Sequence, residues 1–246
     1  MGSRNTKNIQ LNIMQYYQKI NTIYKRSQEP GPNHNKIVYG DWSQPEFEVL
    51  KDLKWEATEK IDGTNMSYQI LCQNGNIDIS IAGKTPAANI PGHLMKAMQD
   101  KLTFEKVLEV FGKDNPETGK TELPYLIEIF GEGYGVKIQK GGNYLKDRAD
   151  FILFDVKITP IESGKPIWLT RQACEDIAKK LGIEIVPIIG YFTLDEAVEY
   201  VKKGFKSVIA ENRDYDAEGL VLRAPCGLLT RMGERIITKI KHCDFY

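Results

Sequence analysis

Stretches of dense or alternating apolar residues mark the predicted strands of this chain. The densest are residues 123–135, 151–158, 218–225 and 235–245, and they are rich in β-branched or aromatic side chains. Residues 65–84 predict two further strands around a turn at Asn74 and Gly75. Residues 26–36 carry Pro, Gly and Asn and predict a loop.

Apolar residues at helical spacing predict helices near the N-terminus and after the first hairpin. Residues 11–20 place Leu11, Met14 and Ile20 on one helical face, with Tyr17 alongside. Residues 94–112 predict one amphipathic helix that ends at its final glycine.

Two later segments carry helix-capping residues. Thr170 is placed to cap a helix in residues 169–182. Thr193 and Glu196 stand at capping-box spacing at the start of residues 193–204, which also end in glycine. Together the elements predict an α+β fold, in which antiparallel strands line a cleft and helices pack outside.

Length and composition are those of an ordinary globular protein. The chain has 246 residues, of which 41% are hydrophobic and 27% charged, and this suits one sizeable domain. We expect residues 1–39 to form a helix and loop belonging to or packed on a core domain of residues 40–246. No run resembles a membrane helix and the N-terminus resembles no secretory signal, so we expect a cytoplasmic protein with no membrane partner.

Cysteine, histidine and charge narrow the possible functions. The four cysteines show no zinc spacing, which predicts free thiols, and the three histidines are scattered. A net charge of zero counts against a protein that coats nucleic acid non-specifically. Residues 137–148 and 231–242 are locally basic, and the lysines of the first stretch either belong to a solvated loop or bind RNA phosphates.

Lys60 is the candidate nucleophile. It lies in the sequence EKIDGTN, where Gly63 lets the turn bring the backbone close to a ligand. By itself a K-x-D-G motif is weak evidence, because a turn lysine is usually solvated. A lysine that attacks phosphorus needs a neutral amine, a metal held by a carboxylate, further cations on the phosphates and an aromatic face for the base.

Residues of each required type follow along the chain. They are the carboxylates Glu128, Glu132 and Glu218, the aromatic residues Phe151 and Phe154, and the lysines Lys239 and Lys241. The last two are separated by one residue, so on a strand both side chains point to the same face.

With these motifs the chain resembles the lysine-adenylating nucleotidyltransferases, which include polynucleotide ligases and mRNA capping enzymes. EKIDGTN resembles motif I of the RNA ligase 2-like branch, and FGEGYGVKIQKGGNY its motif III. FILFDVKI, EGLVLR and KIK are similar to motifs IIIa, IV and V. The resemblance runs from about Gly40 to Lys241 and implies an ATP-grasp-like ligase core whose sheets line an ATP cleft.

The resemblance also implies roles for single residues. Lys60 would attack the α-phosphate of ATP and become lysyl-AMP, and Glu218 would position Mg²⁺ or Mn²⁺. The implied nucleotide contacts are Glu59 to adenine, Asn65 to the phosphates or metal, Glu132 to ribose and Phe154 stacked on adenine. Ile61 is implied as a further nucleotide-binding residue. Lys239 and Lys241 would bind the α-phosphate. Lys84 stands where this branch commonly has arginine, and it offers a point charge in place of a bidentate fork.

Two assignments have rivals in the sequence. Glu128 competes with Glu132 for the ribose, because other branches place the acid at that position of the motif. Phe151 competes with Phe154 for the base. Strand alternation puts these two rings on opposite faces, so one of them is core, and we favour Phe154 for the base, beside Asp155.

The implied activity is an ATP-dependent RNA ligase that joins 5′-phosphate and 3′-hydroxyl ends, in nicked or gapped RNA, as in RNA repair. Alternatives are a DNA-nick ligase, a GTP-using capping enzyme and an inactive module that binds nucleic-acid ends. Neither end of the chain leaves room for the OB-fold or helical domain that such ligases usually add. We therefore expect either a minimal enzyme or a protein or RNA partner in place of that domain, with salt-sensitive nick binding.

Overall fold

The computed structural model describes residues 17–246 with the exception of 74–75, 86 and 140–143. These residues form two compact units. Unit 1 holds residues 17–18 and 63–185, and unit 2 holds residues 19–62 and 186–246. The antiparallel sheets with few helices confirm the predicted α+β class.

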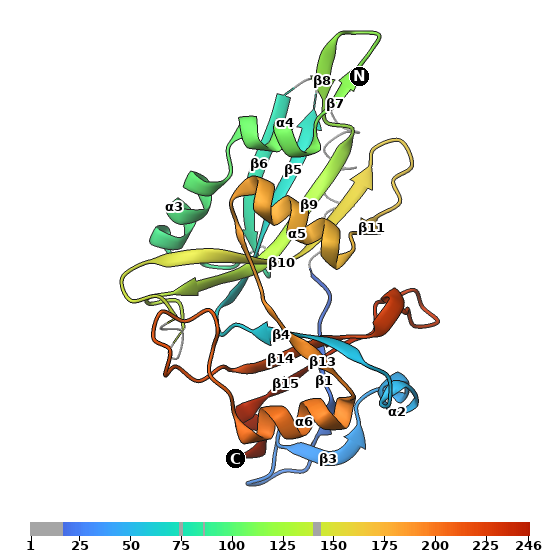
Figure 1. The fold of residues 1–246 in the computed structure, drawn as a ribbon, viewed down its shortest axis with the longest axis vertical. Coiled ribbons are helices and arrows are strands. Elements are labelled where there is room, and N and C mark those ends of the chain that lie inside the picture. The colour runs from blue at the N-terminus through green and yellow to red at the C-terminus, as the bar shows by residue number, and fades with distance from the viewer. Residues whose placement is uncertain (1–16, 74–75, 86, 140–143) are drawn as a thin grey trace. The chain divides into compact units, whose positions relative to one another are not determined.

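Unit 1 is built on one sheet with the strand order β11-β10-β9-β5-β6 (Figure 1). Its strands are β5 (Thr64–Gln73), β6 (Asn76–Gly83), β9 (Tyr125–Gly135), β10 (Ala149–Pro160), β11 (Ile167–Trp168) and β12 (Glu184–Ile185). The neighbours are antiparallel apart from β12, which pairs in parallel with β10. A separate hairpin joins β7 (Lys113–Asn115) to β8 (Lys120–Glu122).

Helices cover one face of the unit 1 sheet. They are α3 (Gly92–Lys101), α4 (Phe104–Phe111) and α5 (Arg171–Leu181). Every second residue of β5, namely Met66, Tyr68 and Ile70, packs with helix residues such as Leu94 and Leu181 in one buried cluster. The alternate residues of the strands therefore point to the other face.

One helix prediction in this unit is wrong. Residues 94–112 form two helices because the chain breaks at Leu102 and Thr103. Leu102 turns into the core, and the Thr103 hydroxyl accepts the backbone N–H of Lys106, so it caps the second helix. A polar cap inside an amphipathic stretch does not change the apolar spacing, which is why the pattern reads as continuous. The second helix does end at Gly112.

The predicted N-terminal helix falls mostly outside the described residues. Residues 11–16 are not described, and residues 17–20 are not helical, so the prediction fails for its last turn. The hairpin predicted in residues 65–84 is confirmed as β5 and β6, although its turn at 74–75 lies outside the described residues.

Unit 2 is built on a second sheet with the order β1-β15-β14-β4-β13. Its strands are β1 (Asn21–Thr22), β4 (Trp55–Lys60), β13 (Ile188–Phe192), β14 (Gly219–Arg223) and β15 (Ile237–Lys241). β1 pairs in parallel with β15, and the other neighbours are antiparallel. The remaining elements are the pair β2 (Tyr24–Arg26) and β3 (Ile37–Trp42), the helices α2 (Pro45–Leu50) and α6 (Leu194–Lys203), and the 3₁₀ turns η1 (Pro225–Gly227) and η2 (His242–Phe245).

The core of unit 2 lies between its sheet and α6 (Figure 1). Trp55 and Ala57 of β4 and Leu220 of β14 pack with Val198 and Val201 of the helix. The predicted capping box of Thr193 and Glu196 is present, as is the Thr170 cap of α5.

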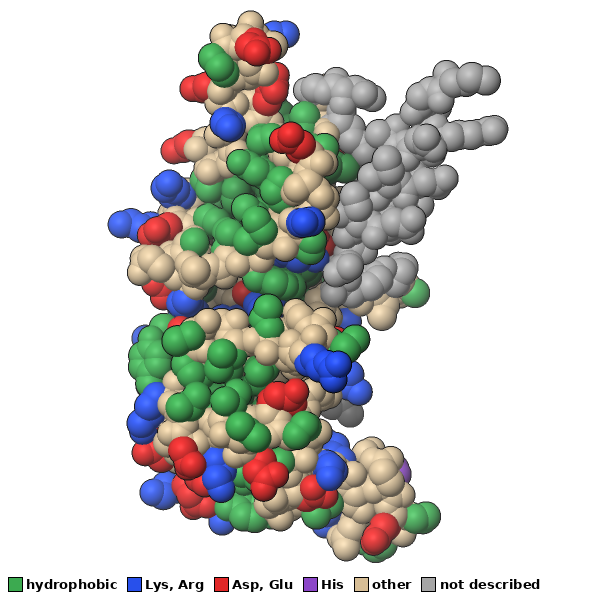
Figure 2. Space-filling model, turned by 90° about the vertical axis from the view of Figure 1, so that its right-hand side faces the viewer, with side chains coloured by type: hydrophobic (Ala, Val, Ile, Leu, Met, Phe, Trp, Pro, Cys, Tyr) green, Lys and Arg blue, Asp and Glu red, His purple; other side chains and the backbone are tan. Residues whose placement is uncertain are grey.

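Charged side chains of both signs are interspersed on the face drawn in Figure 2, which fits the zero net charge. Among the described residues, no helix is both long and apolar enough to cross a membrane.

Candidate functional site

Lys60 and Lys241 lie in register on two strands of unit 2, with one glycine between them. Lys60 ends β4 and pairs with Gly219 of β14, and Gly219 pairs on its other side with Lys241 of β15. Neighbouring strands are about 4.8 Å apart, so two lysine side chains can reach one point above the glycine.

Glu218 provides that meeting point. Its Oε2 lies 2.5 Å from Lys60 Nζ, and its Oε1 lies 2.6 Å from Lys241 Nζ. The Glu218 side chain is 14% exposed and that of Lys60 is 19% exposed, so these charges are partly withdrawn from water. One carboxylate thus neutralises part of the charge of two ammonium groups.

Only glycine fits at position 219. Its φ of 154° is rare for L side chains, and a Cβ there would lie 2.0 Å from the backbone oxygen of Ile240. The backbone of β15 can therefore approach closely enough for Glu218 to reach Lys241. The sequence motif EGLVLR contains this glycine, but its structural reason becomes visible only in the pairing of the strands.

Asp62 is a further carboxylate of this cluster, which the sequence interpretation assigned only to a turn. Burial raises its pKa, as does repulsion from Glu218, while Lys60 and Lys241 lower it. The pKa of Lys241 is lowered by burial but raised by its hydrogen bond to Glu218 and by the charge of that residue, and the net shift is upward. The charge of Asp62 therefore interacts with those of Glu218, Lys60 and Lys241. The available signal was a carboxylate two residues beyond the lysine.

Lys239 shares a strand face with Lys241, as the spacing predicts. Between them Ile240 points into the core, and Thr238 is likewise buried. Lys239 pairs with Val221 of β14 and with Thr22 of β1. The sheet face opposite the core thus carries Lys60 on β4 and Lys239 and Lys241 on β15, with β14 between the two strands.

Glu59 lies on the opposite face of β4 from Lys60, because consecutive strand residues alternate. It is buried, and its oxygens accept the Ser207 hydroxyl at 2.5 Å and the backbone N–H of Val208 at 3.0 Å. Burial raises the pKa of Glu59, although both hydrogen bonds act to lower it. The structure therefore uses this carboxylate to hold the turn that begins at Ser207. The neighbouring Ile61 is buried as well.

In unit 1 the sheet face opposite α3, α4 and α5 carries Asn65 and Glu132 side by side. Asn65 of β5 pairs directly with Glu132 of β9, which in turn pairs with Ile152 of β10. Gly63 makes this approach possible, since a Cβ there would lie 2.3 Å from the backbone oxygen of Gly133. Lys84 follows β6 and is exposed.

Glu128 and Glu132 differ in how deeply they are buried. Glu128 is fully buried, and its Oε2 lies 2.6 Å from the Nζ of Lys157, which is 3% exposed. The Lys157 ammonium also lies 5.4 Å from the ring centroid of Phe130 and 5.3 Å from that of Trp168. Glu128 is thus part of the interior of unit 1, whereas Glu132 is half-buried.

Phe151 and Phe154 also differ in burial. Phe151 is fully buried and packs edge-on against Tyr68 in the helix-covered core. The strand register shifts between Leu153 and Asp155, and Phe154 at this β-bulge is half-buried. The ring of Phe154 contacts Tyr17, a residue that the sequence interpretation placed in a helix.

No group of three or more His, Cys, Asp or Glu side chains that could enclose a metal occurs within the described part of the chain. A Mg²⁺ ion bound mainly by water and phosphate oxygens needs only one or two carboxylates, and Glu218 with Asp62 offers that donor set. The predicted free cysteines are confirmed, since all four are unbridged.

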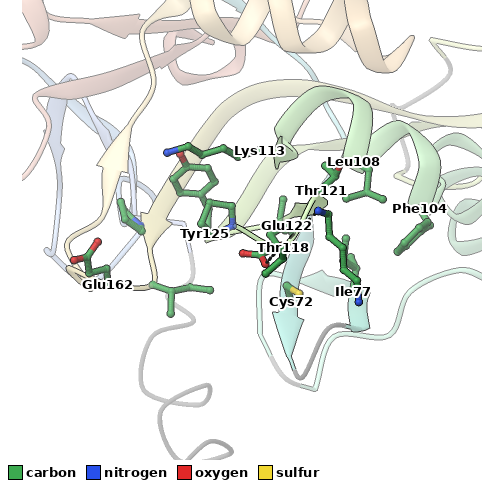
Figure 3. A pocket seen from close by; sticks show the side chains of 15 residues that line it. Cys72, Ile77, Phe104, Leu108, Lys113, Thr118, Thr121, Glu122, Tyr125 and Glu162 are labelled. Carbon is green, nitrogen blue, oxygen red and sulfur yellow. Dashed lines mark hydrogen bonds between the residues drawn. The ribbon is translucent and has the colours of Figure 1, made fainter. Parts of the chain in front are cut away.

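An open groove of about 1030 Å³ also lies in unit 1, beside the β7–β8 hairpin (Figure 3). Its walls include Phe104 and Leu108 of α4, Cys72 of β5 and Ile77 of β6. None of the site residues predicted from the sequence lines it.

The comparisons with known proteins identify a family and a similar fold. The sequence model of a family described as RNA ligase matches residues 53–241. No curated protein matches the chain.

Several solved structures of RNA ligase from Naegleria gruberi have a similar fold. One mutant with ATP and Mn superposes with a TM-score of 0.56 and 16% identity, over 95% of this chain and 57% of that one. Another with ATP and Mn gives 0.52 and 19% identity, over 82% and 52%. An apo mutant gives 0.53 and 18% identity, over 96% and 61%. The present chain thus spans a little over half the length of the ligases it resembles.

Proposed function

This chain belongs to the RNA ligase family, and on that premise we propose that it is an ATP-dependent RNA ligase that joins 5′-phosphate and 3′-hydroxyl ends. The observation that carries the proposal is the pair of lysines, Lys60 and Lys241, gathered on the Glu218 carboxylate. A structural ion pair needs one cation and one anion. Here one carboxylate gathers two lysines, so a candidate nucleophile, a phosphate-binding cation and a metal-binding acid are brought together, and phosphoryl transfer requires these groups.

In the first step the Lys60 amine attacks the α-phosphorus of ATP. An N–P bond forms, the bond from that phosphorus to the bridging oxygen breaks, and pyrophosphate leaves with the bonding electrons. The ammonium proton has to leave Lys60 for its lone pair to attack, and Glu218 Oε2 is within hydrogen-bonding distance of it.

Lys241 and Lys239 supply the charge that the transferring phosphate needs. Both project from the core-free face of β15, and Lys241 is in register with the nucleophile. Negative charge grows on the phosphate oxygens as pyrophosphate departs, so fixed cations stabilise the transition state more than the bound substrate.

The nucleoside is assigned to unit 1 residues. Phe154 stacks on the adenine, Glu132 binds the ribose and Asn65, its cross-strand neighbour, contacts the phosphates. Lys84 adds a point charge. The half-buried state of Phe154 and Glu132, compared with the buried Phe151 and Glu128, supports this choice. The predicted contact of Glu59 with adenine stays a prediction, because its oxygens bind Ser207 and Val208 here.

Glu218, with Asp62 beside it, is the metal-binding candidate. The similar ligase structures contain ATP or AMP together with Mn, which supports a divalent ion, Mg²⁺ or Mn²⁺. When bound, such an ion neutralises charge on the phosphates.

In the second and third steps AMP passes from Lys60 to the 5′-phosphate of RNA, and a 3′-hydroxyl then displaces AMP to seal the strand. The family points to RNA, and a nicked or gapped duplex is the proposed form. A DNA nick and binding without catalysis remain the alternatives, and each gives a distinct experimental outcome.

The test is covalent labelling with α-labelled ATP and either Mg²⁺ or Mn²⁺. We expect a labelled band that is absent in Lys60→Ala and present in Lys25→Ala, where the lost lysine only pairs with Asp41 at the surface. Absence of label in the native protein, or label that survives Lys60→Ala, contradicts the proposal. Sealing of nicks with RNA or DNA 3′-ends then identifies the acceptor.

A further inference from the structure

Tyr17 joins the aromatic residues on the side of the unit 1 sheet opposite α3, α4 and α5. Its ring centroid lies 4.8 Å from that of Phe154, 5.2 Å from that of Phe130 and 5.7 Å from that of Trp168. These spacings are in the range where tilted and edge-on aromatic pairs attract each other. Tyr17 therefore bridges three side chains that come from β9, β10 and β11.

The hydroxyl of Tyr17 has its own partner. It donates to Asp155 Oδ2 at 2.5 Å, and Asp155 is buried. A hydrogen bond that is shielded from water is electrostatically stronger than an exposed one. Tyr17 thus contacts two consecutive residues of β10, Phe154 with its ring and Asp155 with its hydroxyl.

These two residues are at the β-bulge, where strand pairing alone does not fix the side chains. Leu153 pairs with Gly131 and Asp155 pairs with Phe130, so Phe154 is the extra residue of the bulge between β10 and β9. The orientation of the Phe154 ring consequently depends on its side-chain contacts more than it would in a regular ladder.

The other end of the cluster is firmly held. Phe130 is buried and lies 5.5 Å from Trp168, and the Lys157 ammonium, bound to Glu128, lies against both rings. Tyr17 packs between this buried support and the bulge.

We infer that Tyr17 is a positioning residue for nucleotide binding: it holds the Phe154 ring and the Asp155 carboxylate at the bulge so that Phe154 presents its face to the adenine. This inference rests on the proposed function, since it assumes that Phe154 stacks on the base. Tyr17 acts through Phe154 and needs no contact with ATP of its own.

The experiment measures the rate of covalent labelling against ATP concentration for the full-length chain. Tyr17→Ala is expected to raise the half-saturating ATP concentration about 10-fold and to leave the rate at saturating ATP within a few-fold of the native value. Tyr17→Phe keeps the ring and loses only the hydroxyl, so we expect a smaller rise of about 2- to 4-fold.

The matched control is Tyr68→Phe. Tyr68 also packs edge-on against a phenylalanine of β10, Phe151, and its hydroxyl donates to a backbone oxygen, but it lies on the helix-covered face of the same sheet. Removing that hydroxyl should lower the melting temperature without changing the half-saturating ATP concentration. This separates positioning of the base from general loss of stability.

A double-mutant cycle with Phe154→Ala provides the decisive result. If Tyr17 acts through Phe154, Tyr17→Ala adds little to the effect of Phe154→Ala. The inference is overturned if the effects of Tyr17→Ala and Phe154→Ala on the half-saturating ATP concentration multiply in the double variant. It is also overturned if the half-saturating ATP concentration is unchanged or lower in both Tyr17→Phe and Tyr17→Ala. If the native protein is labelled on Lys60 but the Tyr17 variants give one of these contrary results, only this inference fails. If the native protein is not labelled, the proposed function fails.

Discussion

Lys60 and Lys241 stand in register on either side of Gly219, and their ammonium groups bind the two oxygens of one carboxylate, Glu218. These two lysines are 181 positions apart in a chain of 246 residues. Each is placed by an ordinary rule of antiparallel pairing, and the carboxylate lies one residue before the glycine between them. This relationship leads directly to the first two predictions.

Gly219→Ala should destabilise unit 2 and abolish labelling. The added Cβ would lie 2.0 Å from the Ile240 backbone oxygen, so β14 and β15 have to separate. We expect a loss of about 3 kcal/mol or more, as for other overpacked and strained positions. Thermal unfolding measures it. Gly164→Ala is the control, because Gly164 also has a positive φ but open space around it, and about 1 kcal/mol is expected there. Equal effects of both substitutions would contradict the steric account.

Lys241→Met should leave the fold intact and slow the labelling of Lys60. Its stem still covers the strand, but the charge for the transferring phosphate is gone, so a decrease of about 100-fold in the single-turnover rate is expected. Lys203→Met serves as the control, since Lys203 is an exposed residue at the end of α6. A rate within a few-fold of the native value would remove Lys241 from the mechanism.

The buried pair of Lys157 and Glu128 should behave as a structural unit. Lys157→Met leaves the Glu128 carboxylate buried without this cation, and we expect a loss of about 3–5 kcal/mol in unfolding free energy. The double variant Lys157→Met, Glu128→Gln should recover much of that loss, because neither member of the pair is then charged. Denaturant unfolding measures both.

Glu132→Gln is expected to affect ATP binding and not stability, in contrast to substitutions of Lys157 and Glu128. It should raise the ATP concentration needed for labelling while changing stability little, since Glu132 is half-buried. If Glu128 and Glu132 exchanged these two phenotypes, the assignment of the ribose contact would have to be reversed.

Glu59 predicts a pH dependence of stability. Burial raises its pKa in the folded chain, so folding favours the protonated carboxyl. Its contribution is complete below the ordinary glutamate pKa and is lost as the pH rises through the raised folded value. The melting temperature of the native chain should therefore fall relative to that of Glu59→Gln as the pH rises above about 4.5.

Glu196 should change the stability with pH in the opposite direction, so it serves as the control for Glu59. Its pKa is lowered, first by the hydrogen bond from Lys54 and then by the backbone N–H of Thr193. The native chain should thus gain stability relative to Glu196→Gln as the pH rises toward the ordinary glutamate pKa. If the stability differences from Glu59→Gln and from Glu196→Gln changed with pH in the same direction, neither difference would arise from the shifted pKa of the carboxyl group.

Local features of the fold could be predicted from the sequence alone. The capping residues Thr170, Thr193 and Glu196 were readable because a cap acts within one helical turn. The common face of Lys239 and Lys241 followed from strand alternation, which is equally local. The broken helix at Thr103 was missed because spacing alone does not distinguish a buried leucine followed by a cap from a continued helix.

Only the tertiary structure decided between residues of the same type. Glu128 and Glu132 lie on one strand face four residues apart, and burial against Lys157 separates them. The β-bulge and Tyr17, over one hundred residues away, determine the surroundings of Phe154. The closeness of Lys60, Asp62, Glu218 and Lys241 depends on which strands pair. Strand pairing between residues far apart in the sequence depends on the packing of whole sheets. A single sequence indicates where a strand forms but not which strand it pairs with.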